Sequence, residues 1–483
     1  MSFAWRIMEY TGKYEPLKQS NAIFIMAGVA CFVAAFCIYL SQRRNRSKLP
    51  PGPLGWPWIG YTKCLGRDAS KEILYLRQKY GDVFSITLLG KTVVFCNSYE
   101  TIKQAAVSNR TKIGRFTPTI NHWLANGHGI SNYDTKRALQ LRAALLRHMY
   151  GNMSMITFLS ESTQCENDLT NLVQQRIQKL LGEIDRTMGK PINITFMMRL
   201  IVWDIIWWIV FGSKCTLNED IIDRLLQNIS ENNSENGVLQ VAQLMPKVCL
   251  RIISIIPKFL RYWKIYRIAE SHSAVRNILD PRVEHALQNI SDMDSLLKQI
   301  KEDKTLRIKE DELKRLVFEL LAAGTDTSSS TLTWACELLA AEPNYFGERI
   351  TSTVMERIHQ WASVVPFGLP HIARVEFKIQ EYRIPANAII IFNLQNVNWL
   401  ALTDSTGSIL GLPFSIGSRS CPGERFARKL LQLIIEQIHR RYTINKVAND
   451  RGKQKTPTGL ARGPTDSLFI FNCKDTLKYE RVV

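Results

Sequence analysis

FSIGSRSCPGERFA, residues 414–427, places one cysteine between two glycines and directly before a helical pattern. Gly417 and Gly423 allow the backbone to turn closely against a flat ligand. Arg419 can form a charge-assisted pair with a carboxylate of that ligand. Cys421 lies where the helix predicted from near Gly423 begins, and a helix N-terminus favours the thiolate form that binds metal. This cysteine loop is therefore a candidate metal-binding site.

The alternative for the cysteine loop is a glycine-rich turn around a buried structural cysteine, which is the usual role of a lone Cys. The spacing FxxGxRxCxGxxxA ties the cysteine to an aromatic residue, an arginine, two glycines and a helical alanine at once. A structural turn does not require that combination. Phe414 can shield the sulfur from water, and we expect Cys421 to ligate a metal as the thiolate.

A long helix is predicted over Glu310–Leu339, and it contains Ala323–Ser328, AGTDTS. Gly324 followed by small hydroxyl residues weakens a helix and can open its hydrogen-bond ladder. Such an opening leaves room for dioxygen and a water, with Thr327 as hydrogen-bond donor and Asp326 as proton relay. The alternative is a solvent-facing polar patch whose hydroxyls bond back to helix carbonyls.

The N-terminal part has the pattern of a membrane anchor. Residues 22–40, AIFIMAGVACFVAAFCIYL, are uncharged and about long enough to cross a bilayer as a helix. The basic and proline-rich residues 41–53 follow, so the positive-inside rule predicts a cytosolic C-terminal side and a stiff hinge. Residues 1–21 would then be lumenal and 54–483 one catalytic domain. A cleaved signal peptide is disfavoured because the positive cluster follows the apolar run.

Composition narrows the class of protein. Apolar residues make up 46% of the 483 residues and charged residues 22%, as in ordinary globular proteins. The net charge is +19, but the sequence has no zinc-finger spacing, no RRM-like motif and no long basic block outside the N-terminal flank. Binding to nucleic acid is therefore disfavoured. A membrane surface or an acidic redox partner fits better. The ten cysteines are scattered without a CxxC pair, which argues against disulfides and zinc and indicates a reducing compartment.

The remaining periodicity predicts a mainly α fold with a minor β region. Tyr80–Tyr99 alternates around a turn and predicts a β-hairpin, and Arg374–Asn393 predicts further strands. Leu200–Phe211 predicts a buried core helix rather than a second membrane span, because the run is short and contains Asp204. Phe426–Tyr442 predicts another helix.

Taken together, these motifs resemble those of the cytochrome P450 superfamily. The cysteine loop matches the haem-binding signature of that family completely. Ala323–Ser328 resembles the (A/G)Gx(D/E)T(T/S) pattern of its central helix, and Pro50–Pro53 resembles the hinge of its microsomal members. Val365–His371, VPFGLPH, is similar to the segment that passes the haem in family-two-like enzymes.

The resemblance implies haem b, iron protoporphyrin IX, with Cys421 as axial iron ligand. Thr327 and Asp326 would be the catalytic residues that deliver protons. The other residues of the implied cofactor site are Arg419, His371, Arg142, Phe414, Gly423 and Gly324. Of these, the two arginines and the histidine would hold the haem propionates.

The implied fold is the cytochrome P450 fold behind an N-terminal transmembrane helix in the endoplasmic reticulum membrane. The implied function is monooxygenation of a small lipophilic substrate with electrons from NADPH. The implied partners are NADPH-cytochrome P450 reductase and cytochrome b5. Arg425, Arg428 and Lys429 could face the reductase, or they could form an ordinary solvated helix face.

The sequence departs from the family at the ExxR motif, whose positions fall on Arg357 and Gln360. A contact between Glu356 and His359 could stand in for the missing ion pair. The segment before this motif is short, and the PERF-like motif that should follow residues 396–399 is absent.

A further departure concerns the family's early tryptophan, whose place is taken by Arg137 or Ala138. An inactive or haem-deficient P450-like membrane protein, from a truncated isoform or gene model, is therefore the main alternative. An isomerase or dehydratase that needs no electrons is disfavoured by Asp326 and Thr327.

Overall fold

The computed structural model describes residues 48–56, 59–65, 69–117, 128–151, 155, 158–159, 168–233, 264–289, 295–343, 346–347, 349–403, 410–447, 462–464 and 467–474. The predicted anchor, residues 22–40, lies outside this set. Among the helices that the structure does describe, none combines the length and apolarity that a membrane crossing requires.

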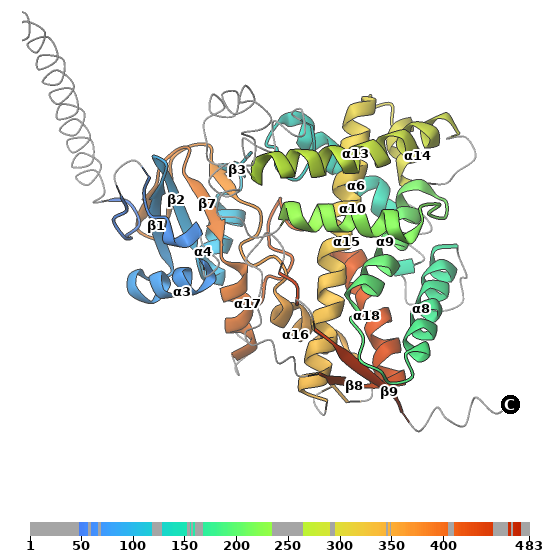
Figure 1. Cartoon of the computed structure of the whole chain (residues 1–483). Coiled ribbons are helices and arrows are strands. Elements are labelled where there is room, and N and C mark those ends of the chain that lie inside the picture. Colours follow the sequence, from blue (N-terminus) through green and yellow to red (C-terminus); the bar gives the residue numbers. More distant parts are fainter. Residues whose placement is uncertain are drawn as a thin grey trace, which may run out of the picture.

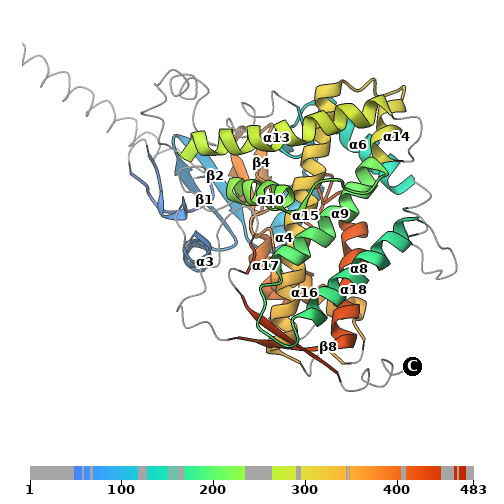
Figure 2. The same cartoon turned by 45° about the vertical axis from the view of Figure 1, so that its right-hand side comes forward.

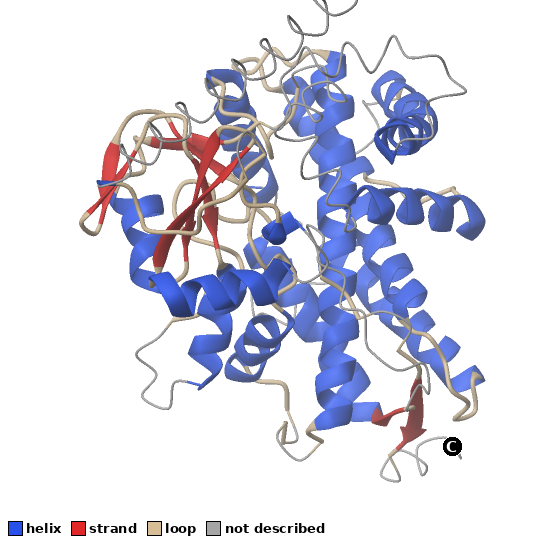
Figure 3. Cartoon of the chain, turned by 60° about the vertical axis from the view of Figure 1, so that its left-hand side comes forward, coloured by secondary structure: helices blue, strands red, loops and turns tan. Residues whose placement is uncertain are grey.

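Helices dominate the fold, as predicted; the strands of the main sheet gather at one side, whereas β8 and β9 lie apart at the lower end of the helical part (Figures 1 and 3). The helices are α3 (Ala69–Tyr80), α4 (Tyr99–Lys103), α6 (Lys136–Gly151), α8 (Asp168–Arg186), α9 (Thr195–Phe211), α10 (Glu219–Asn233), α13 (Lys264–Gln288), α14 (Leu296–Glu302), α15 (Glu310–Ala341), α16 (Ser352–Ala362), α17 (Leu394–Thr403) and α18 (Glu424–Arg441). Short 3-10 and π segments occupy Lys63–Leu65 and Gln104–Ser108.

The long helix α15 runs through the helical part and contributes to the largest hydrophobic core (Figures 1 and 2). Helix α9 packs against it and supplies many of the buried side chains, Trp203 among them. A Cβ on Gly324 of α15 would lie 2.6 Å from Cδ1 of Ile206 in α9, so the glycine permits this close approach. The prediction of a buried core helix over Leu200–Phe211 is confirmed.

The main sheet has five strands in the order β1-β2-β7-β4-β3. Its strands are β1 (Val83–Leu88), β2 (Lys91–Cys96), β3 (Ile113–Arg115), β4 (His371–Ala373) and β7 (Ile389–Phe392). The predicted hairpin is β1 with β2, in which Leu88 pairs with Lys91. Two smaller sheets pair β5 (Phe377–Ile379) with β6 (Tyr382–Ile384) and β8 (Tyr442–Lys446) with β9 (Phe469–Cys473).

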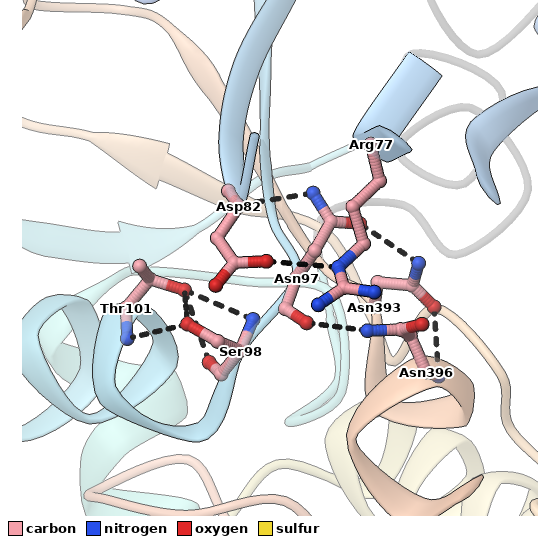
Figure 4. Close-up of polar contacts among 7 residues, drawn as sticks. All are labelled: Arg77, Asp82, Asn97, Ser98, Thr101, Asn393 and Asn396. Carbon is pink, nitrogen blue, oxygen red and sulfur yellow. Dashed lines mark hydrogen bonds and ion pairs between the residues drawn. The ribbon is translucent and has the colours of Figure 1, made fainter. Parts of the chain in front are cut away.

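A buried amide network joins the sheet to α17 (Figure 4). Asn97, just after β2, accepts a hydrogen bond from Nδ2 of Asn393 at 2.8 Å, and its carbonyl accepts one from Nδ2 of Asn396 at 2.6 Å. The amide of Asn97 donates to the carbonyl of Asp82 at 2.9 Å. Because buried amides need partners, this network fixes the position of α17 against β2 and β7.

Candidate functional site

The cysteine loop is held by hydrogen bonds within its own backbone. The amide of Cys421 donates to the carbonyl of Phe414 at 2.9 Å, and the amide of Ser420 donates to that of Gly417 at 3.1 Å. At Gly417, φ is +85°, and a Cβ there would lie 2.5 Å from the backbone oxygen of Ala106. Only glycine fits this position, so the predicted tight turn is explained by a close backbone approach.

The C-terminal side of the loop runs directly into α18. Gly423 precedes Glu424, the first residue of the helix, and a Cβ on Gly423 would meet no described atom within 4 Å. The hydroxyl of Tyr150 donates to the carbonyl of Pro422 at 2.6 Å. The guanidinium of Arg425 covers the ring of Tyr150, 5.1 Å from its centroid. Gly423 is therefore not needed by the protein's own packing.

Cys421 differs from the other described cysteines in being exposed. All of the described cysteines are free; Cys64, Cys96 and Cys336 are buried, and Cys215 and Cys473 are partly exposed. Desolvation by the surrounding protein raises the pKa of the Cys421 thiol, although the Gly423 amide and Arg142 act to lower it. The helix N-terminus alone thus does not produce a thiolate here. A coordinated metal cation would deprotonate the thiol.

Cationic side chains surround the cysteine loop. Arg142 of α6 donates to the carbonyl of Ser420. Arg115 of β3 donates to the carbonyl of Arg419 at 3.3 Å, and strand register places it opposite His371 of β4. Arg419, His371 and Arg142, which were predicted from the sequence, therefore come together beside Cys421. Arg115 was not predicted, because a three-residue strand gives no usable periodicity.

This cationic cluster has little counter-charge among the described residues. Asp134 accepts from Nη2 of Arg419 at 2.8 Å, but Arg374 shares the same carboxylate at 2.6 Å. Within this cluster, three of the buried nitrogens without a hydrogen-bond partner in the described part of the chain lie close together: Nη1 of Arg419, Nε of Arg115 and Nδ1 of His371. Unpaired buried donors are costly, and carboxylates of a bound ligand would satisfy them.

The electrostatics of the cluster agree with this geometry. Burial, followed by repulsion from Arg419 and Arg142, lowers the pKa of Arg115 to about 9. Burial and the neighbouring arginines hold the pKa of His371 well below its usual range. A neutral imidazole still donates one N–H. The residues therefore fit the two propionates of a haem.

On α15, Ala323 and Thr327 are accessible whereas Asp326 is buried. The hydroxyl of Thr327 donates to the carbonyl of Ala323 at 2.8 Å, which is the back-bonded geometry considered as the alternative. The expected opening of the helix ladder is not seen, since α15 is continuous from Glu310 to Ala341. Packing of α9 against Gly324 supports the helix there.

Helix α16 carries the positions of the missing ExxR motif. Arg357 pairs with Glu342 at 3.1 Å. The anticipated contact between Glu356 and His359 is wrong, because Glu356 instead accepts from Nη1 of Arg428 in α18 at 2.6 Å. Residues three positions apart in a helix need not contact each other when a cationic side chain of another helix pairs with one of them.

Arg137 also has a role that the sequence did not predict. Its guanidinium donates to both carboxylate oxygens of Glu312, at 2.7 and 2.6 Å, and to the carbonyl of Leu306. The residue thus ties α6 to the first turn of α15. Ala138 is buried against Tyr133.

The fold and site define a mainly helical protein in which, among the described cysteines, the exposed one lies beside a cluster of arginines and a histidine. The family model described as Cytochrome P450 matches residues 50–360 and 408–471, which is more than half of the chain. The chain therefore belongs to the cytochrome P450 family. The family model leaves residues 361–407 unmatched, a stretch that includes Val365–His371 and reaches the place where the PERF-like motif is expected.

Curated relatives agree with this assignment. The chain is 25% identical to Cytochrome P450 2B12 of Rattus norvegicus over 90% of this chain and 96% of that protein. It is 24% identical to Cytochrome P450 2C41 of Canis lupus familiaris, over 88% of this chain and 94% of that protein. These names confirm the resemblance to family two. Family and relatives support a haem monooxygenase.

Proposed function

We propose that the protein binds haem b through Cys421 and inserts one oxygen atom of O2 into a small lipophilic substrate. The observation that carries this proposal is the set of unpaired buried donors on Arg419, Arg115 and His371 beside the exposed thiol. A dianionic, flat, metal-containing ligand satisfies both features at once. The second oxygen atom leaves as water.

When bound, a thiolate-ligated haem supplies the activation and cleavage of the O–O bond, to which the thiolate contributes electron density. Arg419, Arg115 and Arg142 supply the positive charge that holds the ligand's carboxylates, and His371 donates through Nδ1. Gly417 lets the cysteine loop approach the backbone of Ala106 closely, and Cys421 in the same loop is exposed.

Proton delivery falls to the accessible face of α15. Thr327 lies on this face, and its hydroxyl oxygen can accept a hydrogen bond while it donates to the carbonyl of Ala323. Asp326 lies next to it in the chain and is buried, which suits a relay that is shielded from bulk water. The buried apolar wall formed by α9 excludes water from the opposite side of α15.

Electrons would come from NADPH through a reductase, with cytochrome b5 as a second donor, on the cytosolic face of the endoplasmic reticulum. The basic balance of the chain, +19, supports an acidic partner and an anionic membrane surface. Of the three cations after Cys421, Arg428 already has carboxylate partners within the chain. Arg425, which is exposed, and Lys429 are the better candidates for that contact.

The test is a reduced-plus-carbon-monoxide difference spectrum of the full chain, purified from cells supplied with haem precursor. We expect the Soret band of thiolate-ligated haem in the wild-type protein and its loss in Cys421→Ser. Cys336→Ser, which alters a buried cysteine in α15, is the control and should keep the band. A wild-type chain without haem would refute the proposal and favour an inactive P450-like protein.

A further inference from the structure

The cysteine loop lacks the ion pair that supports it elsewhere in the family, yet Phe414 is enclosed on two sides. The guanidinium of Arg428 lies 4.7 Å from the centroid of the Phe414 ring. The ring of His359 meets it edge-on, with centroids 5.0 Å apart and planes at 68°. These partners come from α18 and α16, which are separate elements, so Phe414 links both helices to the loop.

Ion pairs fix the guanidinium that covers the ring. Nη1 of Arg428 donates to Glu356 of α16 at 2.6 Å, and Nε donates to Glu424 of α18 at 3.0 Å. Arginine is suited to this task because its planar fork can bridge two carboxylates while its face stacks on an aromatic ring. A lysine would provide charge without that geometry.

His359 completes the enclosure as an uncharged ring. The residue is buried, and desolvation together with the nearby Arg428 lowers its pKa to about 3. It therefore does not repel Arg428 across Phe414 near neutral pH. We name the set of Phe414, His359, Arg428 and Glu356 the Phe414 clamp.

The backbone carries the effect of the Phe414 clamp to the sulfur ligand. The carbonyl of Phe414 accepts the amide of Cys421 at 2.9 Å, so a fixed Phe414 fixes the backbone of Cys421. The next residue, Ser415, has φ +63°, a conformation that a non-glycine residue keeps only when its surroundings enforce it. The strained turn at Ser415 therefore directly follows the residue whose ring is clamped.

The residues just before the cysteine loop are held by a different contact. The amide of Leu412 donates to the side chain of Asn398 at 2.6 Å, and Nδ2 of Asn398 donates to Ser363 at 3.0 Å. This contact holds the segment before Phe414 to α17 and to the end of α16. It does not hold the Phe414 ring or the residues that follow it, which are held by the Phe414 clamp.

We propose that Glu356, Arg428 and His359 are positioning residues, which hold Cys421 in place for metal ligation by clamping Phe414. The proposal rests on the haem-thiolate function proposed above. It also explains how the loop keeps its shape although Arg357 and Gln360 occupy the ExxR positions. In this chain the ion pair runs between α16 and α18, from Glu356 to Arg428, and Gln360 adds a hydrogen bond to Glu356 at 3.3 Å within α16.

The experiment compares Arg428→Gln with Arg441→Gln in the full chain. Arg441 lies on the same helix and makes the same kinds of contact, an ion pair with Asp185 and a stack on Tyr442 at 5.8 Å, but at the far end of α18. Amide hydrogen exchange is measured by mass spectrometry over the peptide that contains Ser415, Ser420 and Cys421. Purified protein from cells supplied with haem precursor is used throughout.

We expect exchange in this peptide to become about tenfold faster in Arg428→Gln, which corresponds to about 1.4 kcal/mol, and to stay unchanged in Arg441→Gln. Glu356→Gln should show part of this effect, and the double variant should exchange no faster than Arg428→Gln because the two residues act through one contact. Equal exchange in wild type and Arg428→Gln, or equal acceleration by both arginine variants, would overturn the proposal.

A spectroscopic arm separates positioning of the sulfur from general stability. In the carbon monoxide difference spectrum, Arg428→Gln should show a severalfold larger share of haem without the thiolate band than Arg441→Gln does. An unchanged band in Arg428→Gln would count against positioning of Cys421. If the wild-type chain carries no haem, the proposed function fails, whereas hydrogen exchange on the same preparation still decides whether the Phe414 clamp exists.

Discussion

Gly417 and Gly423 stand on either side of Cys421, but the protein constrains only the first of them. Gly417 has φ +85° and faces a backbone oxygen, so a side chain there strains the backbone and pushes against Ala106. Gly423 has φ −91° and open space around its Cα. The same residue type thus serves two purposes within one loop, close packing against the protein and clearance for a ligand.

We expect Gly417→Ala to destabilise the protein by about 1–3 kcal/mol through backbone strain and overpacking. Gly423→Ala should cost at most about 1 kcal/mol, the effect of alanine at a helix N-cap. Denaturant unfolding measures both. Haem retention adds a second comparison, in which Gly423→Ala should lose haem despite its near-normal stability if the glycine leaves room for a flat ligand. Full haem occupancy in Gly423→Ala would contradict that role.

Among the site residues, those next to a distinctive motif could be predicted and those placed by distant pairing could not. Arg419 and Cys421 belong to one short pattern. Arg115 reaches the site only because β3 pairs with β4, and Arg428 matters only because Glu356 faces it across two helices. Sequence spacing gives no information about such contacts, since they depend on how elements pack.

At the scale of elements, local periodicity predicted well. The helix expected over Glu310–Leu339 is α15, Glu310–Ala341, and the one expected over Phe426–Tyr442 is α18, Glu424–Arg441. The helix positions follow from apolar residues that recur with the helical period. The parallel pairing of β2 with β7 was not predicted, because its partners are brought together by the whole helical part of the chain.

The contact between α13 and α15 contains a histidine that should make stability depend on pH. Nη1 of Arg315 donates to Nε2 of His272 at 2.9 Å, and the imidazole lies 5.0 Å from the ring of Phe318. Burial, then the charges of Arg315 and Arg276, lowers the pKa of His272 from 6.5 to about 4. The unfolded chain therefore binds a proton here at a higher pH than the folded protein does.

Because of this difference, the free energy of unfolding should fall as the pH drops from about 6.5 to 4, by up to about 3 kcal/mol from this residue. His272→Gln keeps an acceptor for Arg315 and should flatten that part of the curve. His285→Gln, an exposed position on the same helix, is the matched control. Chemical unfolding at a series of pH values gives the comparison, and identical slopes for wild type and His272→Gln would exclude the effect.

At the scale of the whole molecule, membrane attachment is proposed to come from residues 22–40. The full chain should stay in the pellet when microsomes are extracted at alkaline pH, whereas a chain that begins at residue 41 should be released. The reason is that a membrane-spanning helix is retained by the burial of its apolar residues in the bilayer, whereas a basic surface is retained only by electrostatic attraction that salt screens. A shortened chain that remains in the pellet would assign the attachment to the domain itself.

Among the described residues, the three largest apolar clusters are separate, one in the helical part and two beside the sheet. The joint between sheet and α17 is made by the neutral side chains of Asn97, Asn393 and Asn396. Since none of these groups titrates, this joint should hold over a wide pH range even where His272 weakens another part of the protein.

The pairing of Asn97 with Asn393 also has a consequence for the order of synthesis. These residues are 296 positions apart, and β2 and β7 just before them form adjacent strands. A ribosome adds about 5–20 residues each second, so β2 waits for roughly 15–60 s before its partner is made. During that time the hairpin presents an unpaired apolar edge, which is a site for aggregation or chaperone binding. The N-terminal region of the newly made chain therefore needs protection until slightly more than four-fifths of the polypeptide has been translated.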